Sequence, residues 1–76
     1  MYSIYRNGKL VGSSSDIEYV IEFTKLMIDK AIDTERDASR LKQLYEDKVA
    51  VNSPNVWLHE LKPILERLGY KLEVDI

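Results

Sequence analysis

The sequence predicts a single α+β domain over residues 1–76: an N-terminal β-hairpin, three helices with the third kinked at Pro63, and a C-terminal strand that completes a small three-stranded sheet. Two observations carry this prediction. Asn7 and Gly8 stand between two short runs of strand-forming residues, and residues 70–76 alternate apolar and charged side chains. Because a lone strand cannot satisfy its backbone, we expect the last strand to pair with the hairpin.

Length and composition limit what the chain can do. A chain of 76 residues has material for one core, and it buries only about 60% of the surface that its unfolded form exposes, so dimerisation would add stability. The lack of cysteine excludes disulfides, thiolate catalysis and cysteine metal sites. The longest apolar runs are a few residues, against about 18 for a membrane span. We therefore expect a cytoplasmic protein with no membrane partner.

The faces of the hairpin follow from its turn. A two-residue type I′ turn at Asn7 and Gly8 sets the register of the two strands. The predicted cross-strand pairs are Arg6 with Lys9, Tyr5 with Leu10, and Ile4 with Val11. One face then carries Tyr2, Ile4 and Val11, and the opposite face carries Tyr5 and Leu10.

The first helix is predicted to begin at Ser15, which has the capping-box spacing to Glu18. Apolar side chains then fill all but a narrow polar stripe as far as Ile32. Such a wide apolar arc indicates burial on more than one side, so this helix is expected to be central or to share its surface with a second subunit.

Two further helices follow. Thr34 is the predicted cap of a mixed-charge surface helix that runs over 34–49. Ser53 and Pro54 suit the start of the third helix, Pro63 should bend it, and Gly69 is a natural left-handed terminator with Tyr70 folding back on the last turn.

The sequence offers little for catalysis or for cofactor binding. His59 has no second histidine to form a metal pair, and we interpret it as a residue on a helix flank. The acidic residues of the first helix form one solvated edge with Lys25 among them: Asp16, Glu18, Glu22 and Asp29. We therefore expect no enzyme, no catalytic residue, no metal and no cofactor.

The favoured interpretation is a small non-enzymatic protein-interaction domain, a homodimeric accessory or regulatory protein of the bacterial or phage kind that binds a larger protein. The predicted interface is Tyr5, Leu10, Tyr19 and Phe23, since the first two face away from Ile4 and the other two extend the helix beyond the width of one sheet. The alternative is that helices cover both sheet faces, or that the tyrosine hydroxyls simply reach water.

The second hypothesis is DNA binding. The segment Pro54–Val74 resembles the last helix and trailing strand of repressor-type helix-turn-helix domains, on a helical run of leucine and isoleucine that ends in Gly69 and a strand. That resemblance covers about a quarter of the chain. It implies phosphate or base contacts by Arg36, Arg40 and Lys42 on the helix 34–49. The net charge of −2, and the lack of a glycine after Ala38 for the tight turn, disfavour nucleic acid.

Overall fold

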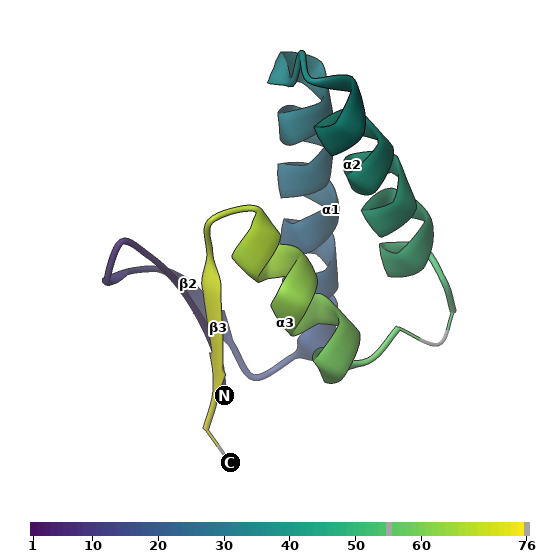
Figure 1. Ribbon diagram of the computed structural model, residues 1–76. Helices are drawn as coiled ribbons and strands as arrows, with labels where there is room; N and C mark the ends of the chain where they lie inside the picture. Colours follow the sequence, from purple (N-terminus) through teal and green to yellow (C-terminus); the bar gives the residue numbers. More distant parts are fainter. Residues whose placement is uncertain (55, 76) are drawn as a thin grey trace.

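The computed structural model describes residues 1–54 and 56–75, and it confirms the predicted α+β architecture. The elements, in chain order, are β1 (Tyr2–Arg6), β2 (Lys9–Ser14), α1 (Ile17–Thr34), α2 (Ala38–Val51), α3 (Leu58–Arg67) and β3 (Lys71–Val74). The strands form one antiparallel sheet in the order β2-β1-β3, so the two ends of the chain do meet as neighbours. Figure 1 shows the three helices gathered on one side of this sheet.

The hairpin has the predicted turn but a different register. Asn7 and Gly8 have φ values of 52° and 78°, as a type I′ turn requires. The predicted pairing of Ile4 with Val11 is wrong, because Ile4 lies opposite Gly12 and the register shifts between Ile4 and Tyr5. A β-bulge therefore takes up one extra residue of β2, and Val11 is exposed where the prediction had it on the core face.

Helix α1 begins one residue later than predicted. Asp16, not Ser15, is its N-cap: the Asp16 carboxylate accepts a hydrogen bond from the Glu18 amide at 3.0 Å. The hydroxyl of Ser14 in turn accepts from the Asp16 amide at 3.0 Å. Aspartate caps as well as serine and adds favourable charge at the positive end of the helix dipole. The helix packs against α2, α3 and β2, which confirms its predicted central place.

The other two helices also begin later than predicted. Thr34 is the last residue of α1, and Asp37 caps α2 by accepting from the Ser39 amide at 3.2 Å. Helix α3 begins at Leu58, so Ser53 and Pro54 precede it and do not cap it. Short polar side chains near a boundary compete for the same backbone donors, which leaves the choice among them to tertiary packing.

The end of α3 matches the prediction closely. Gly69 has a φ of 93°, its amide donates to the Glu66 carbonyl, and the Tyr70 amide donates to the Leu65 carbonyl at 2.8 Å. These two bonds form a Schellman motif that turns the chain directly into β3. The helix is continuous through Pro63, and the predicted bend there stays a prediction. Of the predicted strand 70–76, Ile76 lies outside the described residues.

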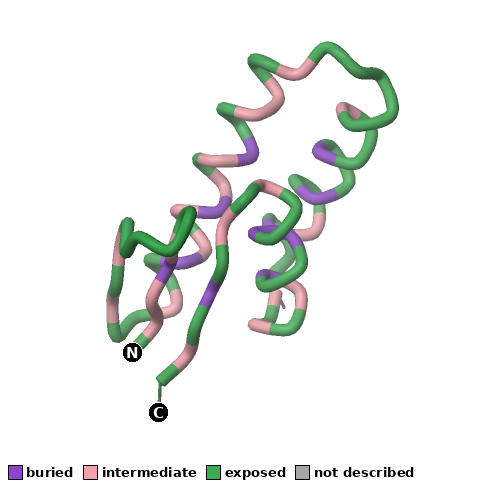
Figure 2. Tube along the Cα trace, turned by 60° about the vertical axis from the view of Figure 1, so that its left-hand side comes forward, coloured by how far each residue is buried: buried purple, intermediate pink, exposed green. Residues whose placement is uncertain are grey.

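The core lies between the covered sheet face and the helices. Its buried side chains come from every element except β2: Ile4, Val20, Ile28, Val51, Leu61, Ile64, Leu65 and Leu72. Figure 2 shows the buried segments on the sides of the helices that face one another and the sheet. Residues alternate between sheet faces, so Ile4 and Leu72, which pair across β1 and β3, define the covered face, and Tyr5 points to the open one.

Candidate functional site

The four residues of the predicted interface form two separate pairs. Tyr5 and Leu10 are cross-strand partners on the open sheet face, where Leu10 is 56% exposed and Tyr5 half-buried. Tyr19 and Phe23 lie on α1, which packs on the opposite face, with their ring centroids 6.4 Å apart. The structure therefore confirms the predicted face of Tyr5 and Leu10 but does not join the four side chains into one surface.

The α1 pair has partners inside the fold. Tyr19 lies over β2 at Gly12, where an added methyl group would fall within 1.9 Å of the Tyr19 hydroxyl oxygen. Phe23 makes an edge-to-face contact with Tyr70, with ring centroids 5.2 Å apart. These contacts give both rings a packing role, although Tyr19 remains 36% exposed.

The most exposed aromatic side chain among the described residues is a different one. Trp57, the only tryptophan of the chain, is 63% exposed at the N-cap of α3. It borders an apolar hollow of about 600 Å³, formed where the start of α1, the start of α3 and the end of the sheet meet. The other lining residues are Tyr2, Ile17, Leu58 and His59.

A second hollow lies against the same tryptophan. It has a volume of about 350 Å³ and shares Ile17 and Trp57 with the first, and it continues along α1 to Ile21 and Lys25. The turn after α2 and Val56 form its other wall. Trp57 thus stands between two concave surfaces, which we call the Trp57 surface. Its position lets the indole contact a bound partner on either side.

The sequence prediction missed this surface because it placed the start of the third helix too early. A helix from Pro54 would carry Trp57 on its apolar, core-facing side. In the structure the Glu60 carboxylate accepts from the Trp57 amide at 3.1 Å, which fixes the helix start at Leu58 and leaves Trp57 outside the first turn. Trp57 is not a usual N-cap residue, so only the glutamate half of a capping box, Glu60, could have indicated this boundary.

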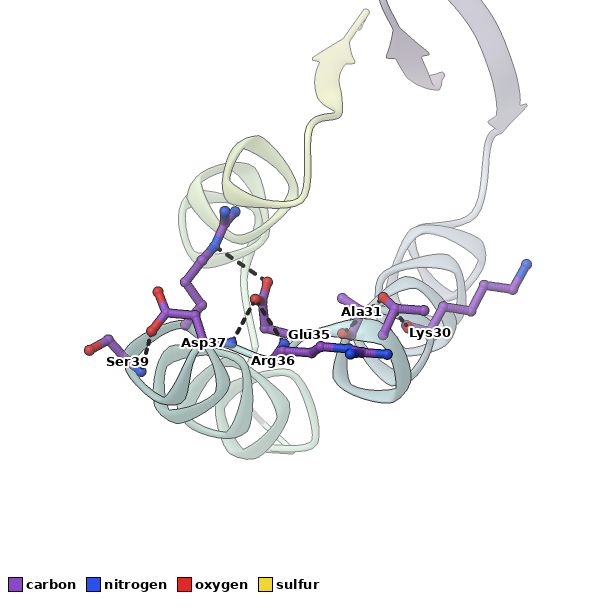
Figure 3. A network of polar contacts seen from close by, with 8 residues as sticks. Lys30, Ala31, Glu35, Arg36, Asp37 and Ser39 are labelled. Carbon is purple, nitrogen blue, oxygen red and sulfur yellow. Dashed lines mark hydrogen bonds and ion pairs between the residues drawn. The ribbon is translucent and has the colours of Figure 1, made fainter.

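The residues of the DNA-binding hypothesis lie around the start of α2, among carboxylates. Figure 3 shows the Glu35 carboxylate accepting from the amides of Arg36 and Asp37. Both hydrogen bonds are 3.1 Å long, and the Arg40 guanidinium lies 3.5 Å from the other carboxylate oxygen. These amide bonds, that of Asp37 first, lower the pKa of Glu35, and the Arg40 charge acts in the same direction. Lys42 is exposed on α2. Arg40 is thus paired with a carboxylate while its side chain stays 69% exposed.

One ion pair ties α2 to α3. The Arg67 guanidinium donates from two nitrogens to the Asp47 carboxylate, at 3.2 and 2.5 Å, and Gln43 donates to the same carboxylate at 3.1 Å. Asp47 is only 4% exposed, so this pairing compensates a buried charge. The hydrogen bond to Asp47 raises the pKa of Arg67 above its ordinary value. The pair stabilises the packing of the two helices and borders only a small hollow of about 160 Å³.

The described part of the chain offers neither a metal cluster nor a membrane-spanning helix, and the chain matches no known family. Within residues 1–54 and 56–75, no three histidine or acidic side chains gather in a way that could hold a metal ion. In the same residues, no helix combines the length and apolarity needed to cross a bilayer. Comparisons with protein-family models, with curated proteins and with solved structures found no match.

Proposed function

We propose that this chain is a non-enzymatic protein-interaction domain that works in the cytoplasm by binding a larger protein, and that the Trp57 surface makes the main contact. The observation that carries the proposal is a tryptophan 63% exposed beside an apolar hollow of about 600 Å³. The open sheet face with Tyr5 and Leu10 is the candidate surface for a homodimer, as the sequence predicts.

The energetics favour this interpretation. A fully buried tryptophan covers about 150–250 Å², and the 63% of Trp57 that is exposed corresponds, at about 25 cal/mol per Å², to about 2–4 kcal/mol of transfer free energy. Tryptophan is also among the residues most enriched at binding hot spots. Most of the indole is exposed to water in the isolated chain. Contact with a partner would bury this surface and so stabilise the complex.

The surface also indicates the chemistry of the partner. Tyr2, Ile17 and Leu58 give the larger hollow an apolar lining, and the ring of His59 stands at its margin. The partner should therefore insert an apolar side chain, such as leucine or phenylalanine, beside the indole. Glu18 and Lys25 border the smaller hollow and supply a polar rim of both signs.

The test compares Trp57→Ala with Tyr45→Ala, an exposed aromatic on α2 outside both hollows. Tagged wild-type protein and both variants are used to capture partners from a native bacterial lysate, followed by mass spectrometry. We expect one dominant protein with the wild type and with Tyr45→Ala, and a loss of at least about tenfold with Trp57→Ala, the size of a hot-spot residue.

A second readout follows from the uniqueness of Trp57. Its fluorescence should show the emission of a water-exposed indole in the free chain and should shift to shorter wavelength when the captured partner is added. Failure of the wild type to retain any protein, or equal retention by all three forms, would contradict the proposal. Recovery of nucleic acid in place of protein would favour the DNA-binding hypothesis.

A further inference from the structure

The outer edge of β3 is a second surface that the fold leaves open. In the part of the chain that the structure describes, β3 pairs with β1 alone, because the strand order is β2-β1-β3. Figure 1 shows β3 nearest the viewer, with nothing crossing in front of it. The opposite edge, β2, carries the bulge near Val11, and bulged strands pair poorly with further strands. The regular edge is therefore β3.

The backbone groups that point outward from β3 can be identified. Met1 and Asp75 exchange both hydrogen bonds, at 2.9 and 2.7 Å, and so form a hydrogen-bonded pair of the β1–β3 ladder. Along an antiparallel ladder, hydrogen-bonded pairs alternate with pairs that share no backbone hydrogen bond. The residues of β3 that bond to β1 are therefore Glu73, opposite Ser3, and Lys71, opposite Tyr5. The amides and carbonyls of Leu72 and Val74 consequently point away from β1 toward the outer edge, where Val74 is half-buried and Leu72 is 5% exposed.

Helix α3 determines what can occupy this edge. It packs on β3, and Figure 2 shows it beside β3 on the side away from the hairpin. A second copy paired through β3 by a twofold axis would bring its own α3 within about one strand spacing, roughly 4.8 Å, of this one. Packed helices need about 8–10 Å between their axes. A single added strand, which brings no second α3, avoids this conflict.

The charges at the edge favour a basic strand. A hollow of about 460 Å³ extends over the open face of β3 from the hairpin turn at Asn7 and Gly8 to the end of α3, and its charged lining residues are Glu66, Lys71 and Glu73. Lys71 and Glu73 already pair with each other, at 3.3 Å between the ammonium nitrogen and a carboxylate oxygen. The carboxylate of Glu66 leaves this group with a net charge of −1. A cationic side chain on the open-face row of an added strand would complement it.

We propose that β3 binds an extended segment of the protein partner by strand addition, with lysine or arginine in the row that faces the hollow. The four residues of β3 span about 13 Å, enough to pair with a segment of four to six residues. The inference rests on the proposed function, because a strand acceptor requires a protein partner. It adds a second contact whose affinity comes from backbone hydrogen bonds and so depends little on apolar side chains.

The experiment follows amide hydrogen exchange by NMR in the full chain. In the free protein the amides of Leu72 and Val74 should exchange fast and those of Lys71 and Glu73 slowly. The probes are three capped seven-residue peptides with valine at alternate positions and lysine, glutamine or glutamate between them. We expect the lysine peptide to slow exchange at Leu72 and Val74 at least tenfold, the glutamine peptide to act more weakly, and the glutamate peptide to have the least effect.

Two variants separate the backbone contribution from the charge. Val74→Pro removes one outward amide donor, whereas Val74→Ala shortens the side chain and keeps the donor, so only the proline variant should bind the lysine peptide at least tenfold more weakly. Glu66→Lys, an exposed change on α3, should shift the preference toward the glutamate peptide.

No protection by any peptide at millimolar concentration would overturn strand addition, and equal binding of all three would overturn the preference for a basic strand. Either result leaves Trp57-dependent capture untouched, so failure here is distinguishable from failure of the proposed function. Loss of capture by Trp57→Ala with normal peptide binding would show two independent contacts.

Discussion

Helix α3 has an aromatic residue at each end, and the two lie in opposite surroundings. Trp57 at the N-cap is 63% exposed and makes one backbone hydrogen bond through its amide. Tyr70, just past the C-terminus of the helix, contacts α1 and β1. Its ring meets Phe23 edge to face, its hydroxyl donates to the Met27 sulfur at 3.2 Å, and the Arg6 guanidinium lies 5.5 Å from its ring centroid.

The comparison separates the part of α3 that holds the fold from the part that faces outward. At the C-terminal end, the Schellman motif, the ion pair of Arg67 and the packing of Tyr70 fix the helix to α1, α2 and β1. At the N-terminal end, the Glu60 carboxylate caps the start and Leu58 packs against the core, while the largest side chain of the chain projects into solvent. A surface that binds a partner can keep exposed apolar area only if stability comes from elsewhere.

The largest expected change in stability comes from replacing Tyr70, and it should exceed the change from replacing Trp57. Replacing a buried aromatic with alanine costs about 3–5 kcal/mol, so the half-buried Tyr70→Ala should lose about 2–3 kcal/mol of unfolding free energy. Trp57→Ala should lose less than about 1 kcal/mol, because exposed positions seldom matter more. Urea unfolding followed by circular dichroism measures both. The contrast breaks down if Trp57→Ala is the more destabilising of the two.

The next effect sharpens the contrast at the C-terminal end. Arg67→Ala leaves the Asp47 carboxylate, which is 4% exposed, with Gln43 as its hydrogen-bond donor. We expect the free energy of unfolding to fall by about 1–2 kcal/mol. This is less than the loss of about 3–5 kcal/mol for breaking a fully buried pair, because Arg67 is partly exposed. Lys62→Ala, an exposed cation on the same helix, is the matched control and should change stability by less than about 0.5 kcal/mol. A double-mutant cycle with Asp47→Ala that gave no coupling would contradict the structural role of the pair.

The smallest expected effect is on the pH dependence of stability, and it concerns Glu35, just after the end of α1. The pKa of Glu35 is lowered in the folded state, chiefly by the Asp37 amide, so its stabilisation is present above the unfolded pKa of about 4.3 and is lost as the pH falls through the lower folded value. Glu35→Gln should therefore flatten the decline in stability below about pH 4.3. Glu46→Gln, an exposed carboxylate of α2, should leave more of that decline in place. Equal dependence of stability on pH in the two variants would contradict the role given to Glu35.

Much of the fold could be predicted from local patterns. Asn7 and Gly8 predict the turn, Gly69 predicts the helix end, and the alternation after Tyr70 predicts the last strand, because each depends on backbone geometry within a few residues. Helix starts were predicted less well. At each of them several capping side chains stand close together, as Ser14 and Asp16 do, and local sequence does not choose among them.

The candidate surfaces needed the tertiary structure for a related reason. Exposure of Trp57 depends on where α3 begins, and the separation of Tyr5 from Tyr19 depends on which sheet face α1 covers. Next to the bulge that moves Val11 off the core face, the hydroxyl of the distant residue Tyr19 occupies the space beside Gly12. Hydrophobic periodicity and secondary-structure propensity describe one element at a time, so they carry no information about contacts between distant elements.

The sequence by itself therefore determined the elements, their order and the pairing of the two chain ends, because turn residues and hydrophobic periods act through local backbone preferences. Only the tertiary structure decided which aromatic residue stays in solvent and which edge of the sheet stays open. Those outcomes depend on how helices and strands far apart in the chain share a limited core, and burial at one position is settled by the volume that the others have already filled.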